Sequence, residues 1–69
     1  MHRVEIRVKG QLNEHWSEWL EDLAIIHTEH GETLLTGLVA DQAALHGLLA
    51  KVRDLGLPLL SVNSTEVEG

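Results

Sequence analysis

The chain has no cysteine, no phenylalanine and no tyrosine, and it has one proline among its 69 residues. Without cysteine it forms neither a disulfide nor a thiolate zinc site. Positive charge is also scarce, because five Lys and Arg residues face eleven Asp and Glu residues and the net charge is −6. We therefore expect no nucleic-acid partner and no anionic membrane surface as a partner, since both require a basic patch.

Long hydrophobic runs are absent as well. No stretch approaches the ~20 apolar residues of a membrane-spanning helix, and the N-terminus alternates charged and apolar residues instead of presenting the apolar core of a signal peptide. These features predict a cytoplasmic protein.

The length allows one domain, expected over residues 1–66, with a frayed tail at residues 67–69. A domain of this size buries only about 60% of its unfolded surface, so its own core is marginal. Because neither disulfides nor a thiolate metal site can reinforce it, idealised packing or oligomerisation is the expected source of additional stability.

Alternation of apolar and polar residues predicts the strands. Val4, Ile6 and Val8 alternate with charged residues, which is typical of a strand with one buried face. The β-branched segment 24–29 and the segment 32–39 are predicted to pair as a hairpin around His30-Gly31. The segment 59–64 is predicted as the last strand.

Two segments have helical spacing. Asn13 is a suitable N-cap for a first helix over roughly residues 14–22. Trp16, Trp19, Leu20 and Leu23 have the spacing of one apolar stripe on this helix and are predicted to enter the core. Asp41 is a suitable N-cap for a second helix, which ends before Gly56 and Pro58. Its apolar face consists of Leu45, Leu48, Leu49, Val52 and Leu55.

The order strand, helix, strand, strand, helix, strand predicts an α+β fold. We expect a ferredoxin-like βαββαβ arrangement, in which a four-stranded antiparallel sheet with strand order 4-1-3-2 carries both helices on one face.

Two parts of the chain carry a resemblance. Gly37–Leu49, continuing through Arg53–Val62, resembles a group of small bacterial proteins of uncharacterised function, and Trp16–Trp19 resembles their first helix. The resemblance implies a stand-alone ferredoxin-like domain. It implies no catalytic, cofactor-binding or metal-binding residues.

The histidines suggest a metal site only weakly. His27 and His30 are three residues apart beside the predicted hairpin turn, where two imidazoles could face one ion, but residues three apart on a strand point to opposite faces and no cysteine completes a ligand set. We therefore expect no metal. The chain also lacks a G-x-S-x-G elbow and a glycine-rich phosphate loop, so we predict no catalytic residue and no cofactor.

The outer face of the predicted sheet is the candidate interface. If Val4, Ile6, Val8, Leu35, Val39, Leu60 and Val62 face the helices, period two places other apolar residues outward. The candidate interface then comprises Ile26, Leu34, Leu38, Leu59, Arg3, Glu5 and Arg7. An exposed apolar patch of this kind is typical of a protein interface, so we expect a homodimer or a higher oligomer. A face of Ala43, Gly47 and Ala50 on the second helix is the alternative contact.

The sequence leaves three functions open. The first is a non-enzymatic, self-associating interaction or scaffold domain. The second is a small-molecule-sensing module with the layout of ACT regulatory domains, although Gly10–Asn13 lacks the Asp-Arg-Pro-Gly run of that class. The third is a cofactor-free enzyme that resembles the dimeric ferredoxin-like monooxygenases and uses a histidine at the subunit boundary. A ligand between subunits would favour the second or third function, and a dry interface the first.

Overall fold

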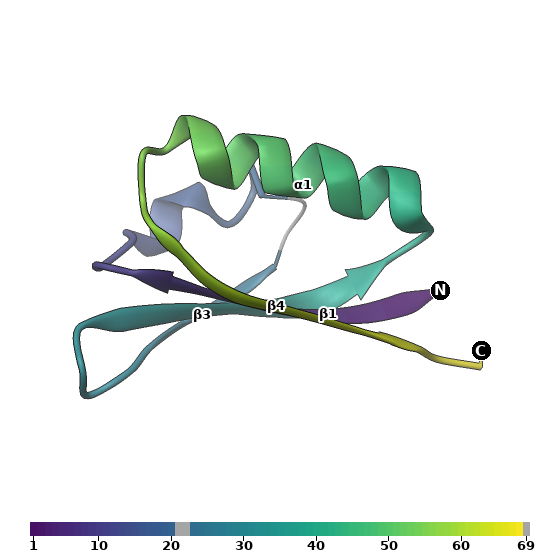
Figure 1. Ribbon diagram of the computed structural model, residues 1–69, viewed down its shortest axis with the longest axis horizontal. Helices are drawn as coiled ribbons and strands as arrows, with labels where there is room; N and C mark the ends of the chain where they lie inside the picture. The colour runs from purple at the N-terminus through teal and green to yellow at the C-terminus, as the bar shows by residue number, and fades with distance from the viewer. Residues whose placement is uncertain (21–22, 69) are drawn as a thin grey trace.

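The computed structural model of the protein describes residues 1–20 and 23–68. Its elements are β1 (His2–Lys9), the 3-10 turn η1 (Glu14–Trp16), β2 (Ala24–His27), β3 (Glu32–Val39), α1 (Gln42–Asp54) and β4 (Leu59–Glu66). The four strands form one sheet in the order β2-β3-β1-β4, and all three neighbouring pairs are antiparallel. Figure 1 shows α1 and the segment around η1 over one face of this sheet.

The central strand β1 has the alternation that its sequence predicts. Val4, Ile6 and Val8 are fully buried beneath the helix, whereas the residues between them face away from it. Because β1 is paired with β3 on one side and with β4 on the other, its backbone groups are satisfied along the whole strand. This strand therefore forms the floor of the core. The rest of the core consists of Leu12, Leu20, Leu23, Leu35, Val39, Leu45, Leu48 and Val52.

Helix α1 begins and ends as predicted. The Asp41 side chain accepts a hydrogen bond from the backbone N–H of Ala44 at 2.8 Å, which satisfies one of the free donors of the first turn. Gly56 follows the helix with a φ of 76°, a left-handed conformation that glycine adopts without strain. Leu48 and Val52 point into the core, and Leu49 is partly buried against it.

The predicted first helix is wrong, and with it the ferredoxin-like βαββαβ fold with two helices. Within the described residues, α1 is the only α-helix, and the segment after Asn13 forms the three-residue turn η1 followed by further turns. Asn13 does cap this segment, by accepting from the N–H of His15 at 3.0 Å. Residues 21 and 22 of the predicted helix lie outside the described residues.

Trp16 and Trp19 also lie elsewhere than predicted. Both indoles are exposed and meet each other edge to face with ring centroids 5.5 Å apart, so the prediction that they enter the core is also wrong. Leu20 and Leu23 are buried in their place. The chain folds back there, because the hydroxyl of Ser17 donates to the carbonyl of Leu23 at 2.7 Å. That geometry fits a turn better than a continuous helix.

Two other predictions need correction. Strand β2 ends at His27, and residues 28–31 form a four-residue connection instead of a two-residue loop at His30-Gly31. Leu60 and Val62, predicted to pack under the helices, are exposed because β4 is an edge strand that the helix does not cover. The tail predicted at residues 67–69 includes Gly69, which lies outside the described residues.

Gly37, in the middle of β3, allows a close contact across the core. A Cβ atom placed there would lie 2.6 Å from Cδ2 of Leu23, which is buried directly over the strand. Glycine inside a strand often marks such a close approach. The turn segment that replaces a helix therefore packs onto the sheet at this position.

We expect Gly37→Ala to destabilise the protein by about 1 kcal/mol, because the new methyl group overlaps Cδ2 of the buried Leu23, whose side chain must shift to make room. Chemical denaturation measures the free energy of unfolding. Combining Gly37→Ala with Leu23→Ala should remove part of the clash, so the double variant should lose less stability than the sum of the single losses. Additive losses would contradict the proposed contact.

Candidate functional site

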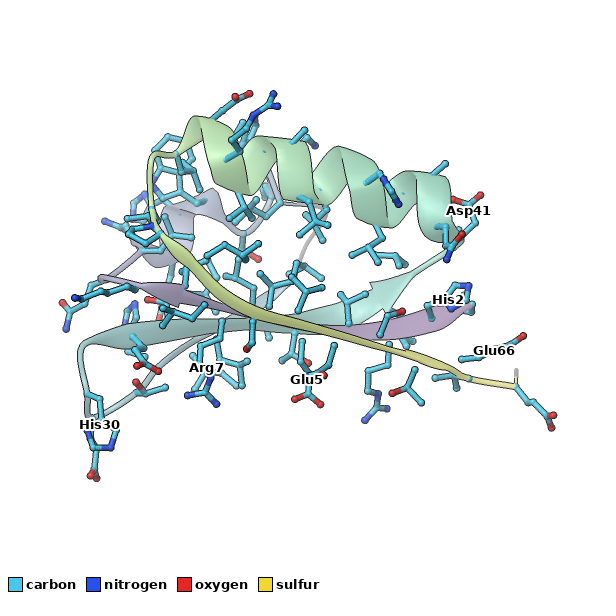
Figure 2. The ribbon with its side chains drawn as sticks, in the orientation of Figure 1. His2, Glu5, Arg7, His30, Asp41 and Glu66 are labelled. Atoms are coloured by element: carbon cyan, nitrogen blue, oxygen red, sulfur yellow. The ribbon has the colours of Figure 1, made fainter. Side chains whose placement is uncertain are left out.

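The uncovered face of the sheet, which we call the open face, is the candidate site. Figure 2 shows the side chains of Glu5 and Arg7 pointing from β1 away from the helix. Residues paired across antiparallel strands share a face, so the register identifies the rest. The open face comprises Ala24 and Ile26 on β2, Glu32, Leu34, Thr36 and Leu38 on β3, Arg3, Glu5, Arg7 and Lys9 on β1, and Ser61, Asn63 and Thr65 on β4.

The apolar part of the open face lies on β2 and β3. Ile26 is in register with Leu34, and their side chains are neighbours across the two strands. Leu38 lies further along β3 and is 49% exposed, and Ile26 is 47% exposed. Three of the predicted interface residues therefore share one half of the open face.

The charged part follows β1. Arg3, Glu5, Arg7 and Lys9 alternate with the buried residues of this strand, and Glu32 lies beside them on β3. Arg7 Nη1 lies 3.0 Å from Glu32 Oε1, so Arg7 forms an ion pair within its own chain. Three cations and two carboxylates leave the open face close to neutral, in a chain whose net charge is −6.

The third part of the open face is polar and uncharged. Ser61, Asn63 and Thr65 on β4 are exposed and in register with Arg7, Glu5 and Arg3. The open face thus changes from apolar on β2 and β3, through charged on β1, to polar on β4. Sequence reasoning missed this last stripe, although the alternation in the final strand could have indicated it.

The structure places Leu59 elsewhere than predicted. Leu59 is in register with Val8, whose side chain is buried on the helix side of the sheet. It lines a groove of about 520 Å³ between the end of α1 and the start of β4. The register shift between Arg7 and Val8, a bulge in β4, breaks the strict alternation on which the prediction depended. We call this cavity the α1–β4 groove; its other lining residues are Leu49, Val52, Arg53, Gly56, Leu57 and Pro58.

A second cavity, of about 470 Å³, lies beside the loop after β1. His15 and His27 line it together with Gln11, Leu12, Asn13 and Glu14. His27 Nε2 lies 2.6 Å from the carbonyl oxygen of Leu12, which accepts a hydrogen bond when that nitrogen carries the proton. Among the described residues, no three His, Asp or Glu side chains gather as metal ligands. His30 lies on the exposed connection between β2 and β3.

Thr33 holds this loop in place. Its fully buried hydroxyl donates to the carbonyl of Gly10 at 2.7 Å and accepts from the backbone N–H of Leu12 at 3.2 Å. The sequence analysis did not single out Thr33. Its position two residues before Leu35, on the buried side of the strand, is the signal that could have identified it.

The alternative contact on α1 has no independent support. Ala43 and Gly47 are exposed on the helix, and nothing lies within 4 Å of a Cβ atom placed at Gly47. No neighbouring backbone therefore approaches the helix there in the single chain.

Over the described residues, no helix is long and apolar enough to cross a membrane.

The comparisons with known proteins give one match. A family model described as Domain of unknown function (DUF8691) matches residues 3–63. That range begins on β1 and ends within β4, so it includes the α1–β4 groove and the open face apart from Thr65. Neither the curated proteins nor the solved structures contain a match to the chain.

We expect Thr33→Val to lower the free energy of unfolding by about 1–3 kcal/mol, because it leaves the Gly10 carbonyl and the Leu12 N–H without their partner. Hydrogen exchange at the Leu12 amide should also become faster. Thr36→Val, on the open face of the same strand, is the matched control and should change stability by less than about 0.5 kcal/mol. Equal effects at the two positions would contradict a special role for the Thr33 hydroxyl.

Proposed function

The chain belongs to the DUF8691 family, and we propose that it is a non-enzymatic interaction domain that associates with itself through the open face. The observation that carries this proposal is the exposed apolar group on β2 and β3. Ile26 and Leu38 are each about half exposed on a strand surface that no other described part of the chain covers. An exposed apolar patch with a polar rim is typical of a protein interface.

Charge supports contact between two copies at this face. Each copy carries a net charge of −6, so two copies repel each other in general. The open face is close to neutral, because Arg3, Arg7 and Lys9 offset Glu5 and Glu32. Two copies therefore meet there with less repulsion than at an acidic surface. Glu5 and Arg3 can also pair across a two-fold axis, which sets the register of the contact.

The available area indicates a weak contact. Four strands at a spacing of about 4.8 Å, with about 3.4 Å per residue, give a face of roughly 500 Å². Standard interfaces bury about 800 Å² from each partner. We therefore propose a reversible homodimer whose population depends on protein concentration. A two-fold axis is the simplest symmetry, because one self-complementary face is sufficient.

A small-molecule-sensing module is the second candidate, and the α1–β4 groove is the observation that favours it. Its volume of about 520 Å³ lies within the range of roughly 300–1,000 Å³ found for ligand pockets. A ligand specific to the folded state raises the melting temperature, so a thermal-shift screen with small aliphatic acids tests this candidate.

The bacterial origin and cytoplasmic location expected from the sequence belong to the proposal too. The absence of cysteine is compatible with a reducing compartment. Neither property is needed for self-association.

We expect sedimentation velocity to show concentration-dependent association of the parent chain and weaker association for Leu38→Lys. The substitution places a charge from each copy in the apolar part of the contact, where burial of an unpaired charge is costly. Ala43→Lys, on the exposed side of α1, adds the same charge away from the open face and should leave the dimer intact.

A monomeric parent at all concentrations would contradict the proposed function. If the parent chain associates and neither Leu38→Lys nor Ala43→Lys weakens that association, the chain associates with itself through a surface other than the open face. Circular dichroism spectra of the two variants establish that each is folded.

A further inference from the structure

Strand β4 is an edge strand that is uncovered on both faces. All eight of its residues are exposed, and among the described strands its only neighbour is β1. Leu59, Leu60 and Val62 are 50%, 45% and 36% exposed. One edge of its backbone therefore faces outward as a row of hydrogen-bonding groups, which is a template for another strand.

The strand lacks the features that usually protect an edge. Protected edges are short or carry proline, lysine or inward-pointing charge. Pro58 precedes β4, and within Leu59–Glu66 the only charged residue is Glu66. The bulge is confined to the first residues, and Ser61–Glu66 pairs regularly with β1. The opposite edge differs, because β2 has only four residues.

We propose that β4 pairs antiparallel with β4 of a second copy, so that two sheets join into one of eight strands. This inference rests on the proposed self-association and names a second contact for it, separate from the open face. A copy that uses both contacts has two different neighbours, so association then continues beyond a dimer. An identical strand is a suitable occupant, because antiparallel pairing across a two-fold axis uses the same backbone groups from both copies. The limited area of the open face leaves room for such a second contact.

Symmetry restricts the register of this pairing. A two-fold axis perpendicular to the sheet keeps the open face of one copy on the same side as that of the other. In an antiparallel pair related by such an axis, one residue lies directly opposite its own copy. An axis at Asn63 pairs the whole regular segment Ser61–Thr65 with its counterpart. Val62 then meets Ser64 of the second copy, and Ser61 meets Thr65, which places hydroxyl groups opposite each other on the open face.

Charge agrees with this register. With the axis at Asn63, Glu66 of one copy lies opposite Leu60 of the other, at the end of β4 where Leu59 lines the α1–β4 groove. Arg53 lines the same groove, is exposed, and has its Nε 3.6 Å from Oδ1 of Asp54. In this register the strand's single carboxylate lies at the end of β4 that is next to this Arg53–Asp54 pair of the second copy, twice in each dimer. Exposed pairs contribute little stability, but they discriminate between registers.

The absence of cysteine makes the register directly measurable. We expect Asn63→Cys to form a disulfide-linked dimer on mild copper-phenanthroline oxidation, because the two introduced side chains face each other at the axis. Ser61→Cys is the matched control on the same strand and face. Its two copies lie four residues apart along the pair, at more than about 10 Å, whereas a disulfide requires Cβ atoms about 4 Å apart.

The expected result is linkage of Asn63→Cys at least about tenfold faster than that of Ser61→Cys, as the distance requirement of the disulfide implies. Equal rates would indicate random collision and would overturn the proposal. Thr36→Cys, on the open face of β3, provides the separate test of face-to-face contact.

The outcomes separate the two proposals. In one outcome the parent chain sediments as a dimer while Thr36→Cys links and Asn63→Cys does not. That result overturns edge pairing and leaves self-association intact. Linkage of Asn63→Cys alone supports edge pairing and counts against the open face. A parent chain that sediments as a monomer and whose cysteine variants do not link overturns both.

Discussion

The fold depends on one-sided burial along β1. Val4, Ile6 and Val8 are fully buried under the helix, and the charged residues between them face the opposite side. Because a strand exposes successive side chains on opposite faces, this alternation determines which side the helix covers. Pairing with β3 and β4 on either side then transmits the same division to the whole sheet. The open face is thus the direct counterpart of the core.

The segment between β1 and β2 completes the core without an α-helix in its described part. Leu12, Leu20 and Leu23 enter the core from this segment, and hydrogen bonds hold its backbone at several points. The buried hydroxyl of Thr33 serves two of these backbone groups at once. Gly37 allows the chain to approach β3 closely at Leu23. Thr33 and Gly37 are a polar residue and a glycine inside β3, and such residues weaken a strand considered alone. Here they attach the segment between β1 and β2 to the sheet.

A small domain with one main helix cannot cover a four-stranded sheet. Helix α1 lies over the central part, so β4 remains exposed on both faces and the open face has no covering layer among the described residues. Surface area is large relative to volume in a chain of this size. The proposed contacts between copies both use surface that the fold leaves uncovered, and both lie mostly within the range that the family model matches, which ends at residue 63 of β4.

The sequence by itself determined the elements whose signals are local. The alternation in β1, the Asp41 cap and Gly56 at the end of α1 correctly identify these two elements, and the register later places Ile26, Leu34 and Leu38 together on the open face. Tertiary structure decided the rest. The stripe of Trp16, Trp19, Leu20 and Leu23 has helical spacing, but only the two leucines fit into the core. The indoles stay at the surface, and Leu23 packs over Gly37. Leu59 lies on the helix side of the sheet and not on the predicted outer side, because a bulge in β4 changes the alternation. The bulge depends on the pairing of β4 with β1, which no local sequence pattern encodes.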